Sequence, residues 1–135
     1  MQLSVAARNG VLDALETVIG TSAIIKIRSG AVPASCATAD AGTVLAKMLL
    51  PSDWLDDAAS GSKSKGANVF EDTDAEDTGT AGHFRIYASD DTTCHAQGTI
   101  TVTGGGGDME FDSLSITAGQ YIVITSFVFV AGNGP

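Results

Sequence analysis

Two histidines and two cysteines are the residues of this chain whose types could support nucleophilic or acid–base catalysis. Neither His83 nor His95 is accompanied by a serine in a Gly-x-Ser-x-Gly turn. Cys94 directly precedes His95, and adjacent side chains of a strand point to opposite faces, so these two groups cannot act together within a strand. We therefore predict no catalytic residues and no enzyme activity, with both histidines on strand faces as ordinary polar or interfacial residues.

An acidic run at residues 71–77 is the best candidate for a metal site. It contains Glu71, Asp72, Asp74, Glu76 and Asp77. A calcium loop of the EF-hand type needs glycine at its sixth position and glutamate at its twelfth. Counted from Asp72, those positions hold Asp77 and His83, so the pattern fails. The run predicts a solvated acidic loop and no metal site.

Four consecutive glycines at residues 104–107 resemble a phosphate-binding loop only superficially. Such a loop lies between a strand and a helix and usually has a lysine nearby. Here the glycines precede Asp108, Met109 and Glu110, an acidic segment typical of a strand. We expect a flexible hairpin tip and no bound cofactor.

Cys36 and Cys94 are far apart in the sequence and form no Cys-x-x-Cys unit, which argues against zinc. Two interpretations remain. In the first interpretation, both residues are free cysteines that serve as small, buried, apolar side chains, as free cysteines often do. Alternatively, they form a disulfide between the first long loop and a late strand, which requires oxidation after release from the cytoplasm.

Length and charge limit the classes of protein to consider. The 135 residues suffice for one domain, which we predict to span residues 1–135. The net charge of −9 argues against a nucleic-acid partner. No apolar run is long enough for a membrane helix, and residues 1–8 lack the pattern of a signal peptide, so we expect no membrane partner and synthesis in a host cytoplasm.

The apolar periodicity predicts one helix followed by many strands. Residues 4–19 place apolar side chains on a single stripe between a serine cap and Gly20. From about residue 23 to 130, short alternating segments separated by glycine predict seven or eight strands. Residues 58–66, rich in serine, glycine and lysine, predict a mobile surface loop. The expected fold is an all-β, mainly antiparallel β-sandwich or jelly roll with one N-terminal helix.

Residues 121–130 are predicted to form one final strand that is apolar on both faces. One face would carry Tyr121 and Val123, and the other Val128 and Val130. A strand with two apolar faces is covered on both sides, and a small sandwich can cover only one of them. We therefore predict a subunit interface that includes Tyr121, Val128 and Val130, and hence a homo-oligomer.

Several segments resemble a family of small virion proteins of tailed bacteriophages and prophages. The resemblance lies in the sequences of residues 3–9, 25–34, 42–46, 79–87, 107–120 and 124–127, and so extends over nearly the whole chain. It implies a non-enzymatic structural protein of the virion that decorates or cements the capsid. The expected partners are the phage major capsid protein and further copies of the chain, as a trimer.

Two alternatives stay open at this point. A neck or tail component of the phage particle could have the same fold and differ only in its position in the virion. A carbohydrate-binding or host-adhesion module is a different class, and it requires exposed aromatic rings, for which the chain offers Trp54, Tyr87 and Tyr121.

Overall fold

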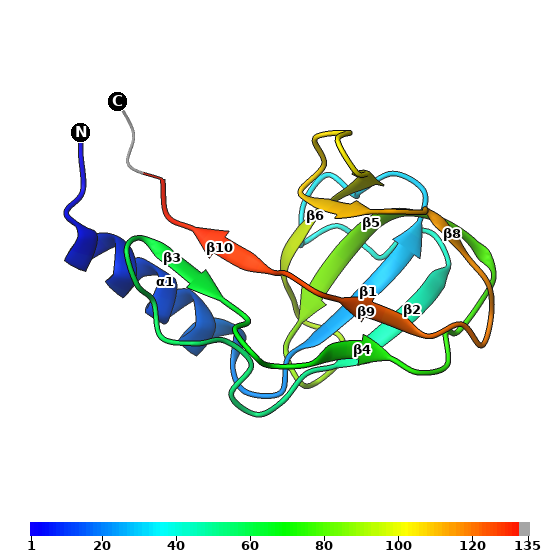
Figure 1. Ribbon diagram of the computed structural model, residues 1–135, viewed down its shortest axis with the longest axis horizontal. Helices are drawn as coiled ribbons and strands as arrows, with labels where there is room; N and C mark the ends of the chain where they lie inside the picture. Colours follow the sequence, from blue (N-terminus) through cyan, green and yellow to red (C-terminus); the bar gives the residue numbers. More distant parts are fainter. Residues whose placement is uncertain (133–135) are drawn as a thin grey trace.

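The chain forms a larger β-structured body and a smaller projecting arm (Figure 1). The structure is a computed structural model and describes residues 1–132. The arm consists of helix α1 (Val5–Ile19) and strands β3 (Ser62–Ser64) and β10 (Val128–Val130). The body contains the other strands, which are β1 (Ile24–Ser29), β2 (Val44–Leu49), β4 (Phe70–Asp72), β5 (Gly79–Tyr87), β6 (Cys94–Val102), β7 (Met109–Phe111), β8 (Ser115–Ile116) and β9 (Ile122–Ile124).

The main sheet of the body has the strand order β2-β1-β5-β6-β7, and β8 pairs with one end of β5. The strand pairs are antiparallel except for β6 and β7, which run parallel. Strand β1 lies in the interior of the sheet, paired with β2 and β5, and its β-branched isoleucines suit such a position. Ile25 pairs with Met48 of β2 and with Ile86 of β5, and all three side chains are fully buried.

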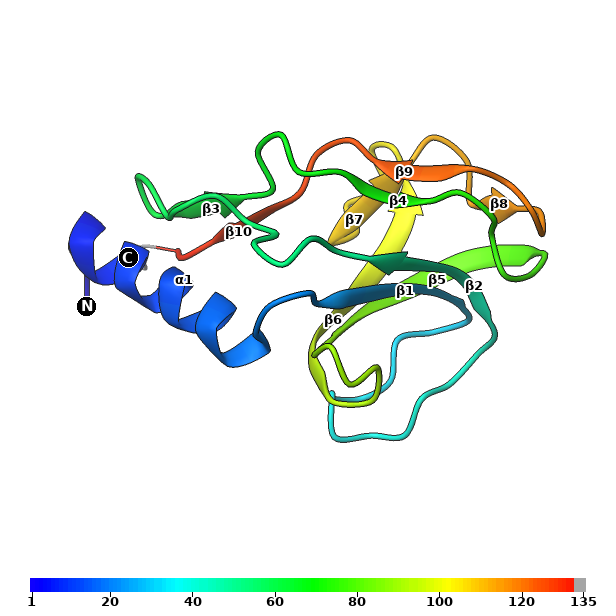
Figure 2. The same ribbon diagram turned by 90° about the horizontal axis from the view of Figure 1, so that it is seen from below.

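A two-stranded ribbon of β4 and β9 lies over one face of this sheet (Figure 2). Phe70, Ile122 and Ile124 of the ribbon are buried in the same apolar cluster as Ile27 and Leu45 of the sheet. This burial between two layers is the main source of stability for the body. The prediction of a β-rich chain with one helix is confirmed for the described residues.

Helix α1 begins and ends where the sequence predicts. The Ser4 side chain accepts a hydrogen bond from the Ala7 amide at 3.1 Å, and Gly20 ends the helix with a positive φ of 90°. The buried stripe is narrower than predicted, because Val11 and Val18 are exposed while Leu12 and Ile19 are buried. The helix therefore has apolar side chains on its outer surface that nothing in the described structure covers.

The prediction of a mobile loop at residues 58–66 is wrong. Residues 62–64 form strand β3, which pairs antiparallel with β10. Lys63 is only 2% exposed, and its ammonium forms ion pairs with Asp13 and Glu16 of α1, each at 2.8 Å. The low hydrophobicity of this segment is compensated by charge pairing with the helix, since a buried lysine requires a carboxylate partner.

The acidic run at residues 71–77 is solvated only in part. Phe70, Glu71 and Asp72 form strand β4, and Asp72 is buried. Its carboxylate accepts hydrogen bonds from the amides of Lys47 and Asp74, at 2.8 and 2.9 Å. Asp72 thus joins the ribbon to strand β2, which corrects the prediction of an acidic loop at this end of the run.

The predicted final strand is divided in two. Strands β9 and β10 are separated by Thr125, Ser126 and Phe127. The break changes which alternate positions face inward, because Ile122 and Ile124 are buried before it whereas the half-buried Phe127 and Phe129 pack on the core after it. A single continuous strand could not bury both sets, since its faces alternate with a period of two.

The glycine run does not form a hairpin tip, which corrects that prediction. Because β6 and β7 are parallel, the connection at residues 103–108 must return the chain along the last three residues of β6. Gly104 and Gly106 have positive φ angles of 83° and 79°, which glycine adopts at no steric cost. Their amides donate hydrogen bonds to the two carboxylate oxygens of Glu110, at 3.1 and 3.0 Å. The glycines thus bind an anion, and that anion is a side chain of the same protein.

Candidate functional site: the exposed faces of the arm and an anchored loop

The outer face of β10 is the surface that the sequence predicts as a subunit interface. Val128 and Val130 alternate with Phe129, so they share one side of the strand, and they are 49% and 65% exposed. Phe129 packs inward, with its ring centroid 6.3 Å from that of Trp54 and 5.1 Å from that of Phe127. The arm therefore presents apolar side chains to solvent on the side opposite its own aromatic contacts.

Tyr121, the third predicted interface residue, lies in another part of the molecule. It precedes β9, on the body side of the break between the two strands, and is 55% exposed. Its hydroxyl donates a hydrogen bond to Glu71 at 2.6 Å, and this bond raises the pKa of the phenol. The structure groups the two valines on β10, and it places Tyr121 on the ribbon of the body.

A long loop at residues 30–43 is anchored to the main sheet by one carboxylate. Asp40 accepts hydrogen bonds from Arg28 at 2.9 Å, from Arg85 at 2.6 Å and from the Tyr87 hydroxyl at 2.7 Å. Burial acts to raise the pKa of Asp40, but the bonds from Tyr87 and Arg85 and the two arginine charges outweigh it, so this pKa lies below its ordinary value. The loop is fixed because a charge-assisted network holds it at three points.

Both cysteines lie at this loop. Cys36 belongs to the loop and Cys94 begins strand β6; each is a half-buried free thiol, and their sulfur atoms are 2.7 Å apart. Burial and the hydrogen bond to Cys36 raise the pKa of the Cys94 thiol to about 12. The structure thus brings together the two residues of the predicted disulfide, and the bond itself stays a prediction.

The two histidines are not brought together. His83 is fully buried on β5, where its Nδ1 lies 3.0 Å from the Gly30 carbonyl oxygen, and its strand partner is Thr99. His95 is half-buried near the opposite end of β6. Full burial of His83 differs from the polar or interfacial position predicted for it. Within residues 1–132 no three His, Cys, Asp or Glu side chains are grouped so that they could hold a metal ion.

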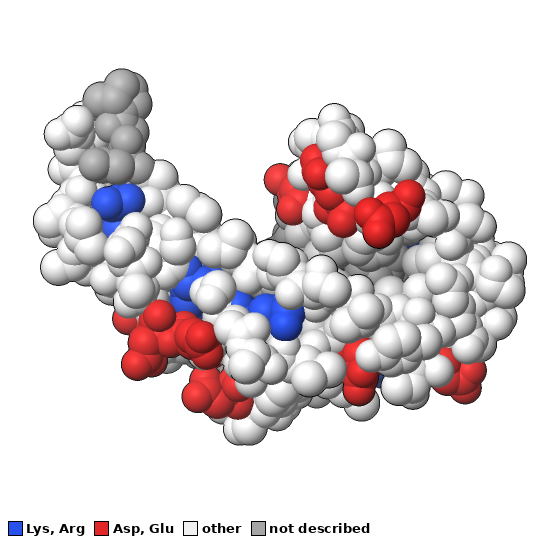
Figure 3. Space-filling view, viewed as in Figure 1, with Lys and Arg blue, Asp and Glu red and all other residues white. Residues whose placement is uncertain are grey.

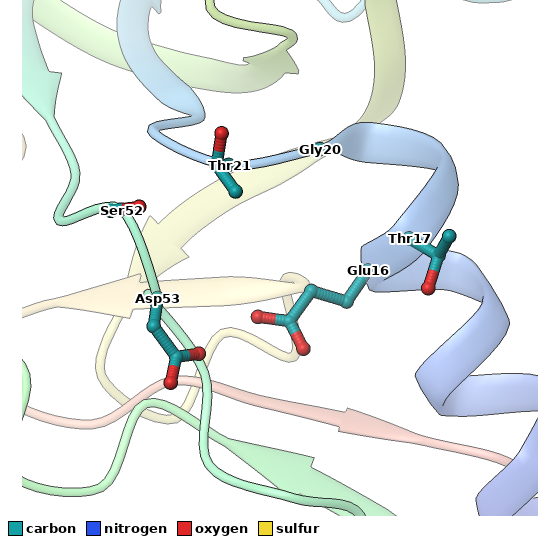
Figure 4. A pocket seen from close by; sticks show the side chains of 6 residues that line it. All are labelled: Glu16, Thr17, Gly20, Thr21, Ser52 and Asp53. Carbon is teal, nitrogen blue, oxygen red and sulfur yellow. The ribbon is translucent and has the colours of Figure 1, made fainter.

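A pocket of about 400 Å³ lies where the arm joins the body (Figure 4). Glu16 near the end of α1 points across it toward Asp53, which with Ser52 belongs to the segment after β2. Glu16 is already paired with Lys63, so this pocket offers one uncommitted carboxylate, and none of its lining residues has a large apolar side chain. It marks the joint between the two regions and has no group that would define a reaction.

The most informative surface property is the location of the basic side chains. It could not be predicted from the net charge, which was the only aspect of charge considered in the sequence. None of the seven Lys and Arg residues, all of which lie within residues 1–132, is exposed. Five of them form ion pairs within the chain, namely Lys26, Arg28, Lys47, Lys63 and Arg85. Lys65 is buried against carbonyl oxygens, and half-buried Arg8 donates to the Ala131 carbonyl. The charge presented to a partner is therefore mainly acidic; Figure 3 shows acidic atoms gathered on the body and along the lower edge of one face, with a few basic atoms visible among them.

Comparison with known proteins identifies no relative, because no family model, no curated protein and no solved structure matches the chain. In residues 1–132 no helix is both long enough and apolar enough to cross a membrane.

Proposed function

We propose that this protein is a non-enzymatic structural component of a tailed phage particle that decorates or cements the capsid by binding major capsid subunits. The observation that supports this most directly is the projecting arm, whose outer surface exposes valines from both α1 and β10. Exposed apolar side chains gathered on a projection are typical of protein interfaces. The resemblance of the sequence segments to small virion proteins supplies the assignment to a phage.

The fold is proposed at a finer level as the β-sandwich or jelly roll that the sequence predicts. The two facing layers of the body, the main sheet and the ribbon of β4 and β9, support this assignment. The parallel pairing of β6 with β7 is a departure from a purely antiparallel arrangement.

We further propose that the protein forms a homotrimer, with Val128 and Val130 in the contact between subunits. Since no basic side chain is exposed, copies of this chain repel one another electrostatically, and the contact has to be apolar. Added salt screens this repulsion, so it is expected to strengthen the trimer.

The assembly test replaces Val128 or Val130 by aspartate and measures the molar mass in solution by light scattering at high micromolar concentration. We expect the wild-type protein to be oligomeric and V128D and V130D to be monomeric, with unchanged circular dichroism. V69D is the matched control, because the exposure of Val69, 55%, lies between those of Val128 and Val130, and Val69 precedes β4 in the body. A monomeric wild-type protein, both in solution and on the particle, would show that the interface proposal is wrong.

The position in the virion is tested by the copy number in purified particles. Hundreds of copies indicate the head shell, whereas about six or twelve indicate the neck or tail, because those parts have cyclic symmetry of low order. Absence from particles would refute the phage assignment altogether.

The carbohydrate-binding alternative is weakened by the structure. Of the three aromatic residues available for stacking on a sugar, Trp54 and Tyr87 are fully buried, and the Tyr121 hydroxyl is bonded to Glu71. A glycan array that shows specific binding would restore this alternative.

A further inference from the structure

A groove of about 700 Å³ runs between two strands of the body that are not paired with each other. One wall is formed by residues 108–113, which include β7, and the other by residues 120–128, which include β9. Strand β7 lies at the edge of the main sheet and β9 belongs to the ribbon, and residues of both line this groove. The groove is therefore the place where the main sheet and the ribbon do not close on each other.

Both walls are strand edges with one side unpaired. Within residues 1–132, β7 pairs with β6 alone and β9 pairs with β4 alone. In an edge strand, alternate backbone N–H and C=O groups point away from the paired neighbour and are available to another strand. Here two such edges border the same groove, so an added strand could form hydrogen bonds on either side.

The side chains along the walls define what such a strand would contain. Met109 of β7 and Ile122 and Ile124 of β9 are buried and point toward the core, whereas Glu110 and Val123 alternate with them and are exposed. An added strand therefore places apolar side chains over the core at every second position. Its remaining side chains point outward on the same side as Glu110.

The outward positions of the β7 wall are acidic. Asp108, Glu110 and Asp112 alternate along this wall, and each carboxylate is held in place by hydrogen bonds from residues 99–106. Figure 3 shows acidic atoms gathered over this part of the body. Such a rim favours lysine or arginine at the outward positions of the added strand.

A second copy of the chain does not meet this requirement, because all seven of its basic residues are held within its own structure. The geometry points to strand addition by a different protein: we propose that the groove between β7 and β9 binds an extended segment in which apolar residues alternate with lysine or arginine. This inference deepens the proposed function, on which it rests for the identity of the partner, a segment of the capsid subunit.

The probe is a synthetic peptide of about seven residues that alternates valine with lysine, a length typical of one strand. Binding to the isolated protein is measured by calorimetry, and the site is located by amide hydrogen exchange. We expect slowed exchange in residues 109–111 and 122–124. We also expect binding to weaken several-fold as salt rises from about 0.05 M to about 0.5 M, because screening acts on exposed charges.

Two control peptides separate strand addition from simple charge attraction. A peptide with glutamate in place of lysine tests the acidic rim, and a lysine peptide with alternate amides N-methylated tests the backbone hydrogen bonds. Both are expected to bind at least about tenfold more weakly, a difference of about 1.4 kcal/mol. Equal binding of the N-methylated peptide, or protection elsewhere in the chain, would overturn the proposal.

A pair of matched variants tests the groove from the side of the protein. Val123→Arg places a large cation in the groove and is expected to weaken peptide binding at least about tenfold. Val69→Arg introduces the same side chain at a similarly exposed valine that does not line the groove, and it is expected to bind normally. Equal binding by V123R and V69R, both folded by circular dichroism, would contradict strand addition.

The peptide assay and the composition of the virion fail independently. A protein that binds the lysine peptide at the groove but is absent from particles refutes the proposed function and leaves the groove assignment intact. A protein that is present in particles but binds no peptide, or whose V123R variant is incorporated as well as V69R, refutes strand addition and leaves the function intact.

Discussion

The body and the arm are held together by different interactions. The body buries a continuous apolar core between two layers, and its ion pairs join loop carboxylates to strands of the main sheet, as Asp91 does with Lys26 and Lys47. The arm is thin, and its ribbon is attached to the helix by Lys63, whose ammonium is buried between two carboxylates. The body is therefore stabilised chiefly by hydrophobic burial, and the arm depends on charge pairing and on its junction with the body.

This difference suggests a division of roles between the two regions. A closed apolar core resists local opening, whereas a region with few buried apolar contacts opens at lower free energy. The arm has few buried apolar contacts and also exposes valines to solvent. Its stability is therefore expected to increase when a partner covers it. The following predictions test the contrast, from the largest expected effect to the smallest.

Trp54→Ala should disconnect the two regions. The buried indole contacts Phe70 of the body and Phe129 of the arm, and its N–H donates to the Gly20 carbonyl at the end of α1, at 3.0 Å. Removing a buried tryptophan costs about 3–5 kcal/mol. We expect urea unfolding to show this loss and hydrogen exchange to show residues 5–19 opening first. A small loss shared evenly by both regions would contradict a role at the junction.

Oxidation of Cys36 and Cys94 to a disulfide should stabilise the body alone. The bond would join residues 58 positions apart and contribute about 4 kcal/mol by the chain-entropy model. Mass analysis without reductant should find the bond in intact particles, and thermal melts with and without reductant should differ. The Cys36→Ser variant is the control and should melt alike under both conditions. Two free thiols in intact particles would end this prediction.

Lys63→Met should weaken the arm and leave the body unchanged. The substitution keeps the apolar stem of the side chain and removes the ammonium, so Asp13 and Glu16 lose their partner. Because Asp13 is half-exposed, water replaces part of the interaction, and we expect a loss of about 1–2 kcal/mol. Exchange should accelerate in α1 and β3 but not in β1. Lys47→Met, at a pair in the body, is the matched control and should not affect α1.

Alkaline pH should destabilise the body by a small amount. Burial, reinforced by the hydrogen bond to Asp40, raises the pKa of Tyr87 from 10.0 to about 12. The folded state thus favours the protonated phenol, and its contribution is complete below pH 10 and is lost as the pH rises toward 12. Denaturant unfolding followed between these pH values should show the decline. Tyr87→Phe should reduce it, and an equal decline in that variant would assign it to another group.

The local features of the fold were predictable from the sequence, and the features that depend on distant residues were not. The predicted ends of the helix, at Ser4 and Gly20, are correct because capping requires only neighbouring residues. Residues 62–64 were missed as a strand because their burial depends on Asp13, which is 50 positions from Lys63. The parallel pairing after the glycine run was missed because it depends on which strand edge Met109 meets.

The same limit applies to the candidate sites. The exposure of apolar side chains at Val128 and Val130 could be predicted, since a strand with two apolar faces indicates a surface that its own domain does not cover. The groove between β7 and β9 could not be predicted, because it exists only where the edges of two layers meet. The burial or half-burial of every basic side chain also required the structure, since a net charge does not indicate where individual charges lie.

The composition of the arm has a consequence for the order of folding. Arg8 of the helix contacts the carbonyl oxygen of Ala131, 123 positions further along the chain. At a synthesis rate of about 5–20 residues per second, the helix waits roughly 6–25 s for the strand that completes the arm. The body can already have collapsed by then, because non-specific collapse of a chain of this size takes well under a millisecond. The arm is thus the last part to be completed during translation, because β10 follows β9, the last strand of the body, and the newly made chain passes through a stage in which a collapsed body carries an unfinished arm.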